Sequence, residues 1–145
     1  MKATWLYRTA AILLLLFAAG HTFGFLNFRA PTAEGQAVFA SMNAVHFQVK
    51  HGTYSYGGWY RGFGLFVSVY QLFSAFLAWH LGGLARKLPR AIGGLGWAFL
   101  ATQVASLVLS WMYFSAIPAA FSGLVAICLG WAAWLVGSAA NAKSA

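Results

Sequence analysis

This chain of 145 residues carries nine lysines and arginines against a single acidic residue, and 61% of its residues are hydrophobic. Only 7% of the residues are charged, whereas a soluble domain has about 25%, so the composition excludes an ordinary water-soluble globular fold. The single acid, Glu34, also excludes reactions that need paired carboxylates and carboxylate-rich Mg²⁺ or Ca²⁺ sites.

Four apolar segments are long enough to cross a bilayer, because a helix needs roughly 20 apolar residues to span hydrocarbon about 30 Å thick. They cover about residues 5–26, 59–85, 90–114 and 118–140, and Pro118 opens the last. We therefore predict an all-α membrane protein, a four-transmembrane-helix bundle that forms a single domain over residues 1–145.

The first segment also fits a secretory signal peptide. Lys2 and Arg8 precede its apolar run, and Ala18, Ala19 and Gly20 are the small residues of a cleavage site. We expect the segment to be retained as a membrane helix.

Between the first two spans, residues 27–57 form a predicted cap. PTAEGQAVFASMNAV has Thr32 as a helix cap, Glu34 in the first turn, and an apolar face of Val38, Met42 and Val45. These features predict a short helix at the membrane interface. FQVKHGTYSY then alternates apolar and polar residues around a His-Gly pair, which predicts a small hairpin that must pack on the helix ends to be stable.

The lysines and arginines fall on two sides of the predicted spans, and cytoplasmic loops carry the excess of such residues. One side has Lys2, Arg8, Arg86, Lys87, Arg90 and Lys143, whereas the cap side has Arg29, Lys50 and Arg61. This bias predicts cytoplasmic termini and an extracytoplasmic cap.

Polar side chains recur at one depth of the predicted bundle. At about 1.5 Å per residue, His21 lies roughly 24 Å above the inner end of its span, and Gln71 and Gln103 lie roughly 21 Å above theirs. The two glutamines should bond each other, because an unsatisfied amide in hydrocarbon is costly. We predict a polar core layer as the candidate ligand-binding site, with Arg61 at its mouth: His21, Ser68, Gln71, Gln103 and Ser106.

Arg61 has two further interpretations. Its side chain can extend to lipid headgroups, or it can pair with Glu34 and clamp the cap onto the bundle. In either case an arginine at the mouth of a polar layer can receive an anionic headgroup.

His21 has three interpretations: a polar contact between helices, a wall of a small-ligand pocket, or a ligand of haem or metal. Two haems would need two histidine pairs at matching depths, and the third and fourth spans contain no histidine. A single site that combines His21 with His46 or His51 stays open, and no other metal site is predicted.

The fourth span carries small residues at spacings of three and four. Alanine and glycine let another helix backbone approach closely, so this row predicts a helix-packing seam, inside the bundle or toward a partner. Its members are Ala116, Ala119, Gly123, Ala126, Gly130, Ala133, Gly137 and Ala140.

Three phrases, GHTFGF at 20–25, WYRGFGLFVS at 59–68 and AWHLGGLAR at 78–86, together resemble a family of small uncharacterised bacterial proteins with four transmembrane helices. The resemblance implies a four-helix fold and a location in the bacterial cytoplasmic (inner) membrane, and it supplies no catalytic residues.

The sequence favours a non-catalytic membrane protein that binds a lipid, another hydrophobic ligand or a membrane partner through its polar layer. Membrane lipids, a second copy of the chain or another membrane protein are the expected partners, and no nucleic acid is expected. Two alternatives stay open. One is a redox accessory protein that binds haem or quinone at His21. The other is a small oligomeric transporter, which the lack of intramembrane carboxylates disfavours.

Overall fold

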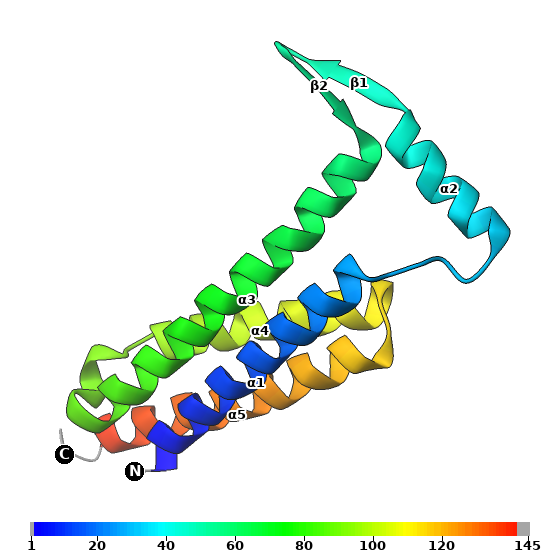
Figure 1. Ribbon diagram of the computed structural model, residues 1–145. Coiled ribbons are helices and arrows are strands. Elements are labelled where there is room, and N and C mark those ends of the chain that lie inside the picture. Colours follow the sequence, from blue (N-terminus) through cyan, green and yellow to red (C-terminus); the bar gives the residue numbers. More distant parts are fainter. Residues whose placement is uncertain (1, 142–145) are drawn as a thin grey trace. The chain divides into compact units, whose positions relative to one another are not determined.

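A computed structural model describes residues 2–141 and the side chains of residues 2–139. Within that range the chain is all-α apart from one hairpin, as predicted (Figure 1). The elements are α1 (Lys2–Leu26), α2 (Ala33–Ala44), β1 (His46–Val49), β2 (Gly52–Ser55), α3 (Tyr56–Lys87), the 3₁₀ helix η1 (Pro89–Ala91), α4 (Leu95–Tyr113) and α5 (Ala116–Asn141). Lys143, used for the predicted orientation, lies outside the described residues, as does the side chain of Ala140.

Four helices in the described range are long and apolar enough to cross a membrane, namely α1, α3, α4 and α5. This finding confirms the predicted number of spans and indicates an integral membrane protein. The third span begins later than predicted, at Leu95 instead of about residue 90. Pro89 starts η1, and Gly93 then takes a positive φ of 48°, which interrupts the helical path before α4 begins.

The chain divides into two compact units, and α1 and α3 contribute to both. Unit 1 consists of residues 1–17 and 71–145, of which residues 2–17 and 71–141 are described. Unit 2 consists of residues 18–70.

Unit 1 is a helical bundle whose core comes from four helices. Tyr7 and Leu14 of α1, Leu81 of α3 and Leu129 of α5 are fully buried, and Phe99 of α4 packs among them. Helices α1 and α3 approach closely at Gly82, where an added Cβ would lie 3.2 Å from the carbonyl oxygen of Thr4. Lipid provides no hydrophobic driving force between helices, so helices in a membrane associate through close packing, which small residues such as glycine allow.

Helices α4 and α5 pack antiparallel in unit 1, along the small-residue seam. An added Cβ at Gly123 would lie 3.9 Å from Leu107, and one at Gly130 would lie 3.4 Å from Leu100. One turn further, a Cβ at Gly96 of α4 would lie 3.3 Å from Ala133. The seam of α5 therefore faces α4 inside the unit. Its alanines at these turns are buried: Ala119, Ala126 and Ala133.

Unit 2 holds the cap. Thr32 caps α2 as predicted, because its hydroxyl accepts a hydrogen bond of 3.1 Å from the backbone N–H of Gly35. Strands β1 and β2 form the predicted hairpin, antiparallel, with Val49 paired to Gly52. The turn is therefore Lys50-His51, one residue before the predicted His-Gly pair, and Lys50 has the positive φ of 51° that tight hairpin turns require.

The hairpin packs on the start of α3 through Phe47. The Phe47 ring lies 4.8 Å from Tyr56 and 4.9 Å from Trp59, measured between ring centroids. Packing of this kind supplies the apolar contact that a two-stranded hairpin lacks by itself. Helix α2 contacts α3 within unit 2 through Phe39 and Asn43, whereas Val38 and Val45 of its predicted apolar face are exposed.

Candidate ligand-binding pocket

Two polar contacts join α1 to α3 within unit 2. The Nε2 atom of His21 lies 3.0 Å from the carbonyl oxygen of Gly64. Because a carbonyl only accepts, Nε2 carries the proton in this contact. One residue further, the hydroxyls of Thr22 and Ser68 are hydrogen-bonded at 2.7 Å. His21 and Ser68 therefore both lie between these helices, and each has a partner there.

Thr22 is a member of this set that the sequence analysis missed. Depth counting would have found it, since Thr22 and Ser68 both lie roughly 25 Å above the inner ends of their spans. The hydroxyl of Thr22 also lies 2.7 Å from the carbonyl oxygen of Ala18 on its own helix. Threonine in a helix commonly bonds to a carbonyl of its own preceding turn in this way, so its presence in an apolar span does not by itself indicate a contact with another helix.

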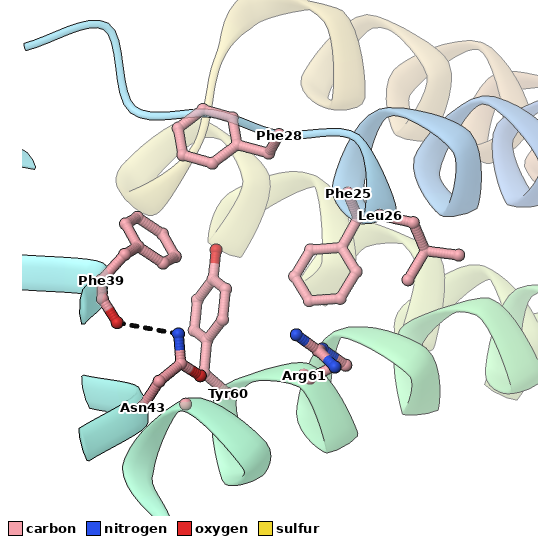
Figure 2. A pocket seen from close by; sticks show the side chains of 8 residues that line it. Phe25, Leu26, Phe28, Phe39, Asn43, Tyr60 and Arg61 are labelled. Carbon is pink, nitrogen blue, oxygen red and sulfur yellow. Dashed lines mark hydrogen bonds between the residues drawn. The ribbon is translucent and has the colours of Figure 1, made fainter. Parts of the chain in front are cut away.

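Beside these contacts, unit 2 contains a cavity of about 360 Å³ (Figure 2). Its walls come from the end of α1, the following loop, α2 and the start of α3. The lining residues are Phe25, Leu26, Phe28, Phe39, Asn43, Gly57, Tyr60 and Arg61.

Aromatic rings form a connected wall of this cavity. Tyr60 lies 5.3 Å from Phe25 and 5.7 Å from Phe39, and Phe39 lies 5.7 Å from Phe28, all between centroids. Tilted and edge-on pairs at these distances are favourable beyond the area that they bury. Figure 2 shows Tyr60 standing between Phe39 and Phe25, so its ring joins the α2 side of the cavity to the α1 side.

Two glycines of α3 make room for this wall. An added Cβ at Gly64 would collide with the Phe25 ring, and one at Gly57 would collide with the Asn43 side chain. Asn43 is also fixed by the hydrogen bond of 2.9 Å that its Nδ2 donates to the Phe39 carbonyl. The glycine-rich start of α3 therefore sets where α1 and α2 can lie against it in unit 2.

Arg61 is the charged residue of the cavity lining within the described chain. Figure 2 places its guanidinium on the Phe25 and Leu26 side. No ion pair joins Arg61 to Glu34 among residues 2–141, so the predicted clamp stays a prediction that this arrangement does not support. Asn43, near the end of α2, lies against Gly57, whereas Glu34 is in the first turn of α2, roughly 13 Å further along that helix.

The other residues of the predicted polar layer belong to unit 1. Gln103 is 3% exposed, and its Nε2 has no hydrogen-bond partner, so the predicted amide pair with Gln71 is not formed through that donor. Ser106 donates to the carbonyl of Thr102 on its own helix, at 3.1 Å. A layer that also includes His21 and Ser68 stays a prediction, because those residues belong to unit 2.

Two of the histidines considered as metal or haem ligands lie on the hairpin of unit 2. His46 Nδ1 lies 2.7 Å from the Ala44 carbonyl, and His51 is in the exposed β1–β2 turn. No group of three or more His, Cys, Asp or Glu side chains gathers among the described residues. A metal site that combines His21 with either histidine stays a prediction without support from this arrangement.

Comparison with known proteins adds no assignment, because no family model, no curated protein and no solved structure matches this chain. The resemblance to small bacterial four-helix proteins therefore stays a prediction, and function is argued from the cavity itself.

Proposed function

We propose that the protein binds an anionic amphiphile, a membrane lipid in the first instance, in the cavity of unit 2. The observation that carries this proposal is the combination of aromatic walls with one arginine that has no acidic partner among the described residues. The aromatic rings suit an acyl chain. The guanidinium suits a phosphate or carboxylate, which it binds with a geometry that lysine does not match.

The size and composition of the cavity support this class of ligand. Pockets for small molecules measure roughly 300–1,000 Å³ and combine apolar walls with a few polar groups. At about 360 Å³ the cavity is large enough for part of a lipid, with the remainder lying along the helices. Tyr60 and nearby Trp59 are residues of the type that gathers at headgroup depth.

We further propose that this cavity opens on the extracytoplasmic side of a bacterial cytoplasmic membrane, with both termini in the cytoplasm. The support is the charge distribution. Four basic residues of unit 1 lie at the start of α1, the end of α3 and in η1, namely Lys2, Arg86, Lys87 and Arg90. The longer cap region and the start of α3 have three. Short cytoplasmic loops carry such an excess.

Lipid binding can be measured on the full chain in a non-ionic detergent, by native mass spectrometry with phosphatidylglycerol and phosphatidylcholine as probes. We expect Arg61→Gln to weaken phosphatidylglycerol binding roughly tenfold, because one charge-assisted hydrogen bond is lost, and to weaken phosphatidylcholine binding less, because its choline cation offsets the phosphate charge. Phe39→Ala should weaken the binding of both lipids, since it opens the aromatic wall.

Arg29→Gln is the matched control. Arg29 is an exposed arginine of the same unit, and it does not line the cavity. Equal losses in the Arg61 and Arg29 variants would mean that phosphatidylglycerol is held by general surface charge, and the proposal would fail.

A further inference from the structure

Two apolar grooves of unit 1 meet at Lys2, the first residue of α1. The first, of about 290 Å³, lies between α1 and α5 and is lined by Lys2, Trp5, Leu6, Trp131 and Leu135. The second, of about 280 Å³, adds α3 and η1 to its walls through Ala85 and Pro89. Because Lys2 and Leu135 line both grooves, the two form one continuous apolar surface, and the ammonium group of Lys2 is the charged group of the lining among the described residues.

The surroundings of these grooves are strongly basic. Arg86 and Lys87 follow the lining residue Ala85, and Arg90 follows the lining residue Pro89. We call the region of Lys2, Arg86, Lys87 and Arg90 the basic end of unit 1. The single acid of the chain, Glu34, belongs to unit 2, so unit 1 has no Asp or Glu to neutralise these cations.

Arg8 differs from the cations of the basic end because it already has a partner. Its guanidinium lies over the Trp79 ring of α3, 4.8 Å from the centroid. Lys2, by contrast, makes no ion pair among the described residues. An uncompensated charge beside apolar grooves attracts a ligand that is anionic at one end and apolar at the other.

The grooves match the apolar part of such a ligand. Trp5 and Trp131 flank the first groove, and Leu6 lies one turn, about 6 Å, beyond Lys2 along α1. An acyl chain that starts at Lys2 and runs along α1 would therefore lie between the two tryptophans. The second groove has room for the start of a second chain, beside Ala85 and Pro89.

We infer that the basic end of unit 1 is a binding site for one anionic phospholipid. Its phosphate lies at Lys2, one acyl chain occupies the groove between Trp5 and Trp131, and the adjoining groove takes the rest of its apolar part. This site uses none of the residues that line the cavity of unit 2, so the inference can be tested independently of the function proposed above.

The test uses the full chain carrying Arg61→Gln, so that the cavity of unit 2 contributes little phosphatidylglycerol binding. Native mass spectrometry then gives the apparent dissociation constants of phosphatidylglycerol and phosphatidylcholine. We expect Lys2→Gln to weaken phosphatidylglycerol binding about fivefold, the worth of one lysine near an anionic headgroup, and Lys2→Arg to retain it. Lys87→Gln removes an exposed charge of the same basic end that lines neither groove, and it should have a clearly smaller effect.

A second pair of variants tests the acyl groove. Trp131→Ala removes a groove wall, and Trp134→Ala removes a tryptophan of the same helix that lines neither groove. The two rings are 57% and 58% exposed, so both truncations should disturb the fold of the bundle to a similar, small extent. We expect several-fold weaker binding of phosphatidylglycerol in Trp131→Ala and little change in Trp134→Ala.

Three results would overturn the inference. Equal losses in Lys2→Gln and Lys87→Gln would show diffuse attraction to the basic end. Equal binding of phosphatidylcholine and phosphatidylglycerol by the Arg61→Gln chain would show that the headgroup charge is not recognised. Indistinguishable behaviour of the two tryptophan variants would show that no chain occupies the groove.

Discussion

His21, Phe25 and Gly64 form the contact through which α1 meets α3 in unit 2. The His21 and Phe25 rings stack at 5.7 Å between centroids, and His21 Nε2 lies 3.0 Å from the Gly64 carbonyl. The missing side chain of Gly64 is what leaves space for the Phe25 ring. A polar bond and a close aromatic contact are therefore both centred on one glycine, and the aromatic wall of the cavity depends on it.

Replacement of this glycine should loosen the contact. Gly64→Ala forces the Phe25 ring to move, and overpacking of this kind costs about 1–3 kcal/mol, part of which is offset by the better helix propensity of alanine. We expect a net loss of about 1 kcal/mol, visible as faster amide hydrogen exchange in peptides from residues 18–28.

Gly62→Ala is the control for this residue. It lies one half-turn away on α3, and an added Cβ there has no neighbour within 4 Å. Its amide hydrogen exchange should be unchanged or slower, because alanine in place of glycine stabilises a helix by up to about 1 kcal/mol. If both variants behave alike, Phe25 does not depend on the gap at Gly64.

At the scale of elements, α5 combines two roles on different faces. Its small residues face α4, with Leu100 at 3.4 Å and Leu107 at 3.9 Å from the Cβ positions of Gly130 and Gly123. Bulky residues of α5 such as Trp131 and Trp134 are mostly exposed, as expected for a helix surrounded by lipid. The α4–α5 pair is thus held by close backbone approach inside unit 1.

A large side chain in the seam should separate these helices. Gly130→Leu introduces a branched side chain where Leu100 already lies at van der Waals distance, so we expect about 1–3 kcal/mol of destabilisation and a lower melting temperature in detergent. Gly137→Leu makes the same exchange two turns along α5, where an added Cβ has no neighbour within 4 Å. It should melt close to the unchanged protein.

The Gly130→Leu result also separates internal packing from assembly. Loss of a co-purifying partner without loss of monomer stability would contradict the internal seam, because it would place the contact between molecules. The melting temperature and the oligomeric state of each variant therefore have to be measured on the same preparation.

For the whole molecule, the four long apolar helices and their exposed aromatic residues indicate an integral membrane protein. Trp111 and Phe114, at 76% and 72% exposure, would form an aggregation-prone surface in water. The orientation proposed for the bilayer rests on the distribution of the basic residues along the sequence.

Cysteine accessibility tests the orientation in intact bacterial cells. In a Cys128→Ser background, Ser41→Cys puts a thiol on exposed α2, and Lys87→Cys puts one at the exposed end of α3. A membrane-impermeant maleimide should label the Ser41 variant in whole cells and the Lys87 variant only after lysis. The reverse pattern would invert the proposed topology and place the cavity of unit 2 in the cytoplasm.

Much of the fold could be predicted from local signals. The length of the apolar segments predicted four spans, Thr32 predicted the start of α2, and the alternation of apolar and polar residues predicted the hairpin. Each of these signals depends on residues that are close together in the sequence. The start of α4 was missed because Gly93 adopts a positive φ that composition does not reveal. The candidate site was harder to predict. His21 and Ser68 have hydrogen-bond partners across α1 and α3, but Thr22 was overlooked and no Glu34–Arg61 ion pair is present among the described residues.

By itself the sequence determined that the chain is helical, apolar and basic, and which four segments form the long helices, because hydrocarbon forces every backbone group to be satisfied within its own segment. Only the tertiary structure decided which side chains meet. The aromatic cavity depends on Phe25, Phe39 and Tyr60, residues that are far apart in the chain. They come together because glycines of α3 leave room for their neighbours, and such complementarity of shape has no signature in composition or periodicity.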